Sequence, residues 1–339
     1  MERYVLYNDD KRIASFDVHN SIIISYTPEV QELLPMQIRN TSAEGFSSWV
    51  RERAIDMNSF IHRSLMKHLT GSRDRITVSI KTHMYSISDT FTCFLEGDFT
   101  PRAELCNADD QNSISDFILL SSDTSLRNAL LVTPNASTEG SYTKTWRYED
   151  SEWWLYKIEN KEALEAEVKI SQALIKCGWD TAVYQYSDSL NNCVRSRNFL
   201  YKNEFFEPYD SFRFFFDNTS DADDVINNNI VSLGEEYLKA WKKIMIADAL
   251  FGNTDRHMRN FGLIRSSITG EVLRLAPNFD NNQAMYANPG KRYPAGMLKI
   301  YMETADDEDC DNLKTLLNVI KDDPYFIDAY KNGSVNILL

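Results

Sequence analysis

The sequence lacks the features that are typical of membrane proteins, secreted proteins and proteins built around a disulfide framework or a zinc site. None of its apolar runs approaches the roughly 18 residues of a membrane span, and its first residues lack the apolar core of a signal peptide. Its five cysteines are odd in number, scattered, and without C-x-x-C spacing, which argues against a disulfide framework or a zinc site. We therefore expect a soluble, cytoplasmic protein with reduced thiols.

Basic charge is also scarce. The chain has 36 Lys and Arg against 50 Asp and Glu, a net charge of −14. Such an acidic surface disfavours direct binding to nucleic acid or to anionic membranes, because both carry negative charge. By contrast, apolar residues make up 43% and aromatic residues 12% of the 339 residues. These contents are ample for a packed core, and the length suits two domains or one large two-lobed unit.

The first 125 residues contain no constellation of catalytic side chains, and we expect them to bind a partner or to brace the next domain. Their hydrophobic pattern predicts, in order, a hairpin (4–7 and 12–16), a strand (22–26) and two helices (46–57 and 60–69).

The most informative stretch runs from Gly252 to Gly262 and has the sequence Gly-Asn-Thr-Asp-Arg-His-Met-Arg-Asn-Phe-Gly. Asp255 and Asn260 are five residues apart, as are the base aspartate and the metal-binding asparagine of the protein-kinase catalytic loop. Loops rich in Asp and Asn often only form turns, so the spacing by itself leaves both interpretations open.

A predicted hairpin would return the chain to this loop. Residues 261–264 and 272–275 have strand-like patterns around a turn, and Ala-Pro-Asn-Phe-Asp280 follows. The hairpin would place Asp280 beside Asn260, where a carboxylate and a carboxamide could share Mg²⁺, a cation that prefers oxygen ligands. Asp255 would then be free to orient a substrate hydroxyl. Phosphoryl transfer needs little beyond such positioning and charge neutralisation.

Upstream residues supply candidate phosphate contacts. Gly140 lies in a loop rich in Ser and Thr, where a glycine lets backbone amides approach phosphate oxygens. The loop is followed by a predicted strand, a turn at Glu149-Asp-Ser and a second strand that ends near Lys157, which could neutralise those oxygens. A helix is predicted over 161–178, and its first acidic residues could reach Lys157 or could simply complement the helix dipole. An ordinary hairpin with surface hydroxyls is the alternative interpretation of the loop and strand.

The second half of the chain contains one further candidate binding segment and several predicted helices and strands. The segment from Glu204 to Phe206 could hold adenine through its backbone, or could be an ordinary loop. The other predicted elements are strands over 183–186 and 198–201, an exposed loop over 217–229, a long helix over 233–251, and late helices around 313–320 and 325–330.

Together these motifs resemble the HipA-like serine/threonine kinases, whose fold is similar to that of protein kinases and phosphatidylinositol kinases. The matching residues, over about residues 130–290, are Ser137-x-x-Gly140-x-x-x-Lys144, Lys157, Glu167, Gly252-Asn-x-Asp255-x-His257-x-x-Asn260-Phe261 and Leu275-Ala-Pro-x-x-Asp280. The resemblance implies an α+β, two-lobed protein-kinase-like fold with a small β-rich lobe, a larger α-helical lobe and an N-terminal α/β subdomain. The expected boundaries are 1–125, 126–206 and 207–339.

The resemblance also implies the roles of individual residues in an ATP- and Mg²⁺-dependent kinase. Asp255 would be the catalytic base, and Asn260 and Asp280 would hold Mg²⁺. Lys157 would contact the ATP phosphates, with Glu167 as its ion-pair partner.

The glycine-containing loop adds a regulatory expectation. Ser137 occupies the position of a loop serine that persistence toxins of this family autophosphorylate, and Thr138 and Ser141 are nearby alternatives. Two added negative charges beside a triphosphate site would repel nucleotide or move the loop.

The resemblance implies partners as well. The family often provides the toxin of a toxin–antitoxin pair, so we expect a protein substrate and a small DNA-binding antitoxin, with any DNA contact made by that partner. Two alternatives stay open: a kinase for a small molecule or a lipid headgroup, and a nucleotide-binding pseudokinase that acts as a binding module. The retained Asp255, Asn260, Asp280 and Lys157 argue against the pseudokinase.

Overall fold

The structure is a computed structural model that describes residues 3–17, 22–26, 28–39, 43–54, 60–106, 108–120, 132–138, 142–217, 220, 222–285 and 295–333. The chain forms two compact units. The first comprises Met1–Ile158, Leu200–Asp217 and Leu263–Arg274, and the second comprises Glu159–Phe199, Asn218–Gly262 and Leu275–Leu339. Each unit therefore combines segments that are far apart in the sequence, and the linear boundaries at residues 125 and 206 remain a prediction.

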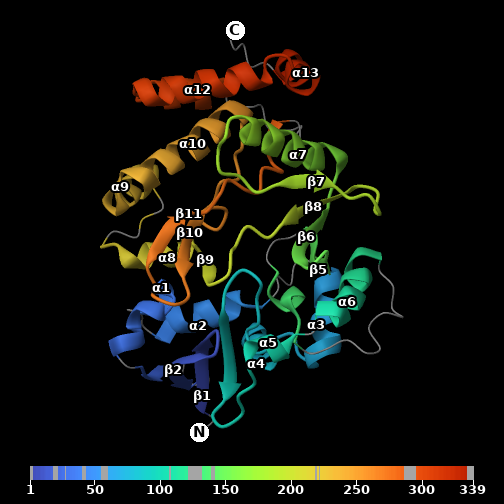
Figure 1. Cartoon of the computed structure of the whole chain (residues 1–339), viewed down its shortest axis with the longest axis vertical. Helices are drawn as coiled ribbons and strands as arrows, with labels where there is room; N and C mark the ends of the chain where they lie inside the picture. Colours follow the sequence, from blue (N-terminus) through green and yellow to red (C-terminus); the bar gives the residue numbers. More distant parts are fainter. Residues whose placement is uncertain are drawn as a thin grey trace. The chain divides into compact units, whose positions relative to one another are not determined.

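The first unit opens with a four-stranded antiparallel sheet in the order β3-β2-β1-β4; β1 and β2 are labelled in Figure 1. Its strands are β1 (Arg3–Asn8), β2 (Lys11–Asp17), β3 (Ile22–Ser25) and β4 (Phe91–Leu95). The predicted hairpin is confirmed, because Asn8 pairs with Lys11 and Tyr4 with Phe16. At its turn Asp9 has a φ of 49°, a left-handed conformation that aspartate tolerates better than most residues.

Aromatic side chains join this sheet to helix α2 (Ala43–Glu52). The rings of Phe16 and Phe46 lie 5.0 Å apart, and those of Trp49 and Phe91 lie 6.0 Å apart. Both helices expected here form, the second as α3 (Phe60–Thr70). The other helical elements of this region are η1 (Pro28–Leu33), α1 (Met36–Arg39), α4 (Arg75–Lys81), α5 (Arg102–Leu105), α6 (Ala108–Leu120) and η3 (Pro134–Ser137).

A second hairpin carries Lys157. Strands β5 (Thr143–Glu149) and β6 (Glu152–Ile158) pair in unbroken register, with Lys144 opposite Lys157. The two residues of its turn have φ values of 53° and 65°, as a two-residue turn between twisted strands requires. Helix α6 is bonded to this hairpin through Ser115, whose hydroxyl donates to the Trp146 carbonyl at 2.5 Å.

The first unit also contains a three-stranded sheet in the order β11-β10-β9. Its strands are β9 (Glu204–Pro208), β10 (Gly262–Ser266) and β11 (Val272–Leu275), so the hairpin predicted after the Gly252–Gly262 stretch is confirmed. Short helices α8 (Tyr209–Phe212) and η4 (Arg213–Phe215) follow β9.

Arg265 on β10 ties the N-terminal segment to this sheet. Its side chain is fully buried and donates to Glu207 Oε2 at 2.5 Å. It also donates to the backbone carbonyls of Glu32 at 2.6 Å and Leu34 at 3.2 Å. The segment at Glu32 and Leu34 and the β9–β11 sheet are therefore joined by buried hydrogen bonds within the first unit.

The second unit is mainly helical, and its core is formed by apolar side chains from four helices. Among them are Leu174, Leu250, Phe251, Leu316 and Phe326. Helix α12 packs against both α10 and α7 (Figure 1). The helices are α7 (Lys161–Lys176), α9 (Asp223–Leu233), α10 (Glu235–Phe251), α11 (Ala295–Met302), α12 (Asp307–Ile320) and α13 (Pro324–Gly333), and the strands are β7 (Tyr184–Tyr186) and β8 (Cys193–Arg197).

Two predictions for this region are wrong. The segment 217–229 was predicted as an exposed loop, but α9 covers Asp223–Leu233. The segment is rich in Asp and Asn, but Ile226 and Ile230 are four residues apart and are buried on one face of the helix. Packing of that face stabilises the helix. The strand predicted over 198–201 does not form there, and the strand of this region is β8 at Cys193–Arg197. Pairing with β7, more than local composition, determines which residues form the strand.

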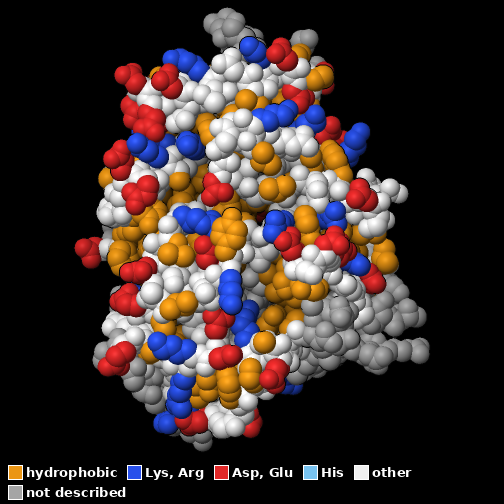
Figure 2. Space-filling model, in the orientation of Figure 1, with side chains coloured by type: hydrophobic (Ala, Val, Ile, Leu, Met, Phe, Trp, Pro, Cys, Tyr) orange, Lys and Arg blue, Asp and Glu red, His pale blue; other side chains and the backbone are white. Residues whose placement is uncertain are grey.

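The surface carries charged side chains of both signs, as the composition of the sequence predicts. Acidic and basic side chains are interspersed over the face shown in Figure 2. Within the described ranges, no helix combines the length and the apolar character that a membrane crossing requires.

Candidate active site

The site begins where helix α10 ends. Gly252 caps the helix with a φ of 66°, a left-handed conformation that glycine adopts without strain. Its N–H donates to the Asp248 carbonyl, and the Asn253 N–H donates to the same oxygen at 3.0 Å. The long apolar helix therefore stops sharply, and the loop that carries Asp255 starts from a fixed point.

A buried ion pair lies under this loop. Arg256 Nε donates to Asp248 Oδ2 at 2.8 Å, and Nη2 donates to Asp248 Oδ1 at 2.9 Å. Both side chains are about 95% buried, with exposed fractions of 6% and 4%. Burial alone would lower the pKa of Arg256, but the Asp248 carboxylate, with further contributions from Asp280 and Tyr184, raises it. Arg256 is therefore a permanent cation at the base of the loop.

Arg256 joins the two segments that contain the predicted metal ligands. Its Nη1 donates to the backbone carbonyl of Asn260 at 2.8 Å and to that of Phe279 at 2.5 Å. Because one nitrogen contacts both oxygens, the chain at Asn260 and the chain next to Asp280 lie side by side. The structure thus brings together the catalytic-loop motif and the segment after the hairpin.

Asp255 and Asn260 are positioned by bonds inside the loop. The Asp255 carbonyl accepts hydrogen bonds from the Asn260 side-chain Nδ2 at 2.9 Å and from the His257 N–H at 2.8 Å. Its own N–H donates to Asn253 Oδ1 at 3.2 Å. Asp255 is exposed and Asn260 is buried. The aspartate can therefore meet a substrate from solvent, while the asparagine is held beneath it.

Asp280 has an unusual backbone conformation, with a φ of 58°. Its N–H donates to the Tyr184 hydroxyl at 3.3 Å. Two residues earlier, Asn278 donates its N–H to the Asp180 carbonyl at 3.0 Å and accepts from the Ala182 N–H at 2.8 Å. These bonds fix the approach to Asp280, and left-handed conformations of residues other than glycine are frequent where function constrains the backbone.

The donor atoms suit Mg²⁺, which takes one or two carboxylates and completes its shell with phosphates and water. Asn260 uses its nitrogen to bond the Asp255 carbonyl, so its carboxamide oxygen remains as the atom that can face a cation. Asp280 supplies a half-buried carboxylate. Among the described residues, no three or more His, Cys, Asp and Glu side chains gather as a metal cluster. Asn260 and Asp280 are the residues that would hold the cation.

Lys157 and Glu167 belong to different units, and each is buried. Lys157 on β6 is 2% exposed, and its ammonium lies 5.6 Å from the centre of the Tyr142 ring. Glu167 on α7 is 0% exposed. Charged side chains are rarely buried so fully without a structural or functional reason. Their ion pair remains a prediction.

The other predicted contacts are placed as follows. The hydroxyls of Ser137 and Thr138 lie 3.1 and 3.4 Å from the Pro134 carbonyl, and Thr138 is 5% exposed. Phosphorylation of either would remove the hydroxyl hydrogen that makes this bond. Gly140 and Ser141 lie outside the described residues.

At the predicted adenine segment, backbone amides already have partners inside the first unit. The Phe206 N–H donates to the Ser88 carbonyl at 2.8 Å, and the Glu204 N–H donates to the Tyr201 carbonyl at 3.2 Å. The Glu204 carboxylate accepts from Arg274 Nη2 at 2.7 Å. An adenine contact here would have to use other atoms, and it remains a prediction.

The sequence interpretation missed the buried polar groups that support the site. Asp248 was hidden within an apolar helix, although an acidic residue near a helix C-terminus opposes the dipole and so signals a specific partner. Farther along, Asn282 donates to both carboxylate oxygens of Glu159 at 3.3 and 3.1 Å, and both residues are buried. No local pattern indicates this pairing, because the partners are 123 residues apart.

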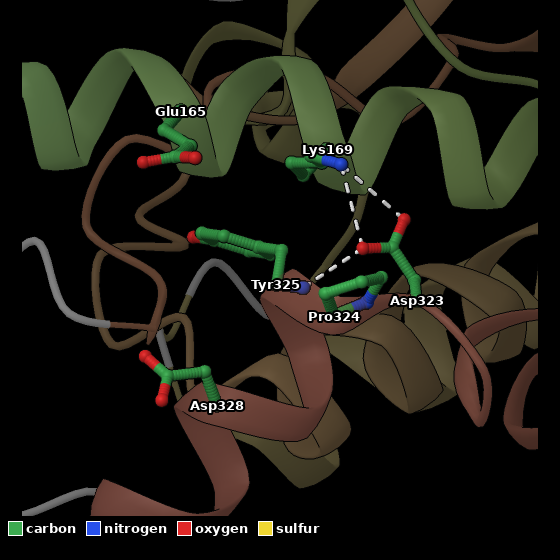
Figure 3. A pocket seen from close by; sticks show the side chains of 6 residues that line it. All are labelled: Glu165, Lys169, Asp323, Pro324, Tyr325 and Asp328. Carbon is green, nitrogen blue, oxygen red and sulfur yellow. Dashed lines mark hydrogen bonds and ion pairs between the residues drawn. The ribbon is translucent and has the colours of Figure 1, made fainter.

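A separate pocket of about 490 Å³ lies between α7 and α13 (Figure 3). It is lined by Glu165, Lys169, Asp323, Pro324, Tyr325 and Asp328. The Lys169 ammonium lies 3.3 Å from Asp323 Oδ2, and the Tyr325 N–H donates to Asp323 Oδ1 at 2.9 Å. These bonds hold the start of α13 against α7. The pocket shares no residue with the candidate active site.

Known proteins resemble this chain in fold and not in overall sequence. Comparison with protein-family models and with curated proteins gives no match. Among solved structures, a chain of the Shewanella oneidensis MR-1 toxin–antitoxin complex of HipA, HipB and operator DNA is similar over 98% of this chain and 96% of that chain. Its TM-score is 0.56, and the sequences are 14% identical. The Helicobacter pylori proinflammatory kinase CtkA gives a TM-score of 0.42 at 14% identity, over 57% of this chain and 87% of that chain.

The similarity to the Shewanella structure confirms the resemblance to HipA-like kinases at the level of the fold, and with it the mixed α and β architecture. At this identity it concerns the fold alone, so the activity has to be argued from the site.

Proposed function

We propose that this protein is an ATP- and Mg²⁺-dependent protein serine/threonine kinase of the HipA-like type. The observation that carries the proposal is the contact of Arg256 with the carbonyls of both Asn260 and Phe279. This contact supports the proposal because it brings the chain at Asn260 next to the chain that precedes Asp280. The predicted base, Asp255, directly precedes Arg256 in the sequence.

In this proposal Asp255 accepts the proton of a substrate hydroxyl while the hydroxyl oxygen forms a bond to the γ-phosphorus of ATP. The bond from that phosphorus to the β,γ-bridging oxygen breaks, and ADP leaves. Mg²⁺, when bound, supplies charge neutralisation on the phosphate oxygens. Lys157 adds positive charge on the phosphates, and Glu167 keeps its ammonium in place.

The toxin role is part of the same proposal. The similar Shewanella HipA occurs in a complex with HipB and operator DNA. By analogy, a small DNA-binding antitoxin would be the partner of this chain, whose net charge of −14 makes direct DNA contact unfavourable. Autophosphorylation at Ser137, Thr138 or Ser141 would provide a switch by adding charge near the phosphates.

The test is transfer of ³²P from γ-labelled ATP by purified protein with Mg²⁺ and a mixture of cellular proteins. The wild type should transfer the label, and Asp255→Ala should lower the rate by about 10²- to 10⁴-fold because the proton acceptor is lost. Asp280→Asn should lower it as well. Asp188→Ala, at a side chain that is 97% exposed, is the matched control and should be active.

Each alternative has its own outcome. Label on a small molecule or a lipid but never on protein would replace the protein substrate. Nucleotide binding without transfer in every variant would make the chain a pseudokinase and end the proposal. Mass spectrometry of the labelled protein tests the switch, which is wrong if an active kinase leaves all three loop hydroxyls unmodified.

A further inference from the structure

We propose that Arg256, anchored by Asp248, is a positioning residue for the Mg²⁺ site. It would hold the backbone beside Asn260 and Asp280 at one fixed separation, so that their side-chain oxygens meet the same cation. The inference rests on the proposed function.

The bonding of the guanidinium supports this role. Arginine has five N–H donors in a rigid fork, and here each has an acceptor. Two bind the Asp248 carboxylate, at 2.8 and 2.9 Å. Two bind the carbonyls of Asn260 and Phe279 at 2.8 and 2.5 Å, and one binds Asn281 Oδ1 at 3.0 Å. The acceptors come from the end of α10, the loop and the segment around Asp280.

The Arg256 guanidinium makes more hydrogen bonds than an ion pair with Asp248 alone would need. A lysine could neutralise Asp248, but its ammonium has no planar fork that reaches two carbonyls and a carboxylate in one plane. Mg²⁺ needs near-ideal octahedral geometry, so a small change in the separation of its two protein ligands weakens binding. Residues that orient metal ligands typically account for about 10- to 100-fold in metal affinity.

The chain offers a matched control in Arg265. It too is buried, pairs with a buried carboxylate, Glu207, at 2.5 Å, and donates to backbone carbonyls, among them that of Gly270 at 2.9 Å. It belongs to the first unit and has no predicted role in metal binding. R256K and R265K therefore make the same chemical change in two comparable environments.

The experiment measures Mn²⁺ binding, as a paramagnetic substitute for Mg²⁺, to full-length protein with a non-hydrolysable ATP analogue, by water-proton relaxation. Far-ultraviolet circular dichroism and a thermal melt establish that each variant is folded. We expect R256K to raise the Kd of Mn²⁺ about tenfold or more, and R265K to raise it less than threefold. Transfer by R256K should recover when Mg²⁺ is raised to saturation, which a purely structural defect would not allow.

The outcomes separate the inference from the proposed function. If Asp280→Asn weakens Mn²⁺ binding but R256K behaves like R265K, the positioning role is wrong and the kinase proposal stands. If the wild type binds no Mn²⁺ with the analogue, or Asp280→Asn changes nothing, both fall. Should R256K not fold, Asp248→Asn replaces it: this change loosens the anchor, and a folded variant with wild-type affinity would overturn the inference.

Discussion

Replacing Glu207 by alanine should destabilise the protein strongly, because the buried positive charge of Arg265 would lose its partner. Glu207 is 3% exposed and accepts from the fully buried Arg265 at 2.5 Å. It also accepts from the Met36 N–H at 2.6 Å and the Ser211 hydroxyl at 2.8 Å. Removing one partner of a buried ion pair costs about 3–5 kcal/mol, since the other charge remains desolvated.

The assay is urea unfolding monitored by tryptophan fluorescence, with a thermal melt beside it. We expect Glu207→Ala to lower the free energy of unfolding by about 3–5 kcal/mol and the melting temperature by on the order of 10 °C. Glu271→Ala is the matched control, because Glu271 is an exposed glutamate next to the same sheet, where substitutions usually change stability by less than about 0.5 kcal/mol.

A double variant, Glu207→Leu with Arg265→Met, removes both charges and should recover much of the loss, because apolar pairs of similar volume often replace buried ion pairs without penalty. If Glu207→Ala unfolds within about 1 kcal/mol of the control, the pair does not hold the N-terminal segment to the β9–β11 sheet. The segment from Glu32 to Met36 would then be held to the sheet by other contacts.

Two further predictions concern local geometry. Gly270→Ala should be strongly destabilising, because a Cβ there would lie 1.9 Å from the Glu32 carbonyl oxygen. Gly97→Ala also places alanine at positive φ but meets no atom within 4 Å, so it should cost only about 1–2 kcal/mol; equal losses in urea unfolding would show that the contact is absent. Asp74→Ala should cost about 1 kcal/mol, because Asp74 caps α4 by accepting from the Thr77 N–H at 2.8 Å. The Thr77 hydroxyl and N–H lower the pKa of Asp74. The stabilisation by Asp74 is therefore present above the ordinary carboxyl pKa and is lost as the pH falls below it. The free energies of unfolding of wild type and Asp74→Ala should converge at acid pH, and a difference that stays constant with pH would contradict this.

Local pattern predicted those parts of the fold that local physics controls. The β1–β2 and β5–β6 hairpins depend on strand-forming segments on both sides of short polar turns, and α7 ends at Lys176, two residues before Gly178, which has a φ of 69°. Helix α10 was predicted over 233–251 and begins at Glu235, because Gly234 has a φ of 142° that a helix cannot include. By contrast, α9 was missed because its stabilisation comes from packing of its buried face, with α10 as a neighbour, rather than from helix propensity.

The same division applies to the candidate site. Sequence patterns were enough to identify the five-residue spacing of Asp255 and Asn260, to predict the hairpin that follows, and to suggest the similarity to HipA-like kinases that the fold confirms. The position of Arg256 between Asp248 and the Phe279 carbonyl, which is 23 residues away along the chain, became evident only in the folded protein. A hydrogen bond between distant residues leaves no periodic trace in the sequence, because its partners are brought together by the packing of whole elements and not by neighbouring residues.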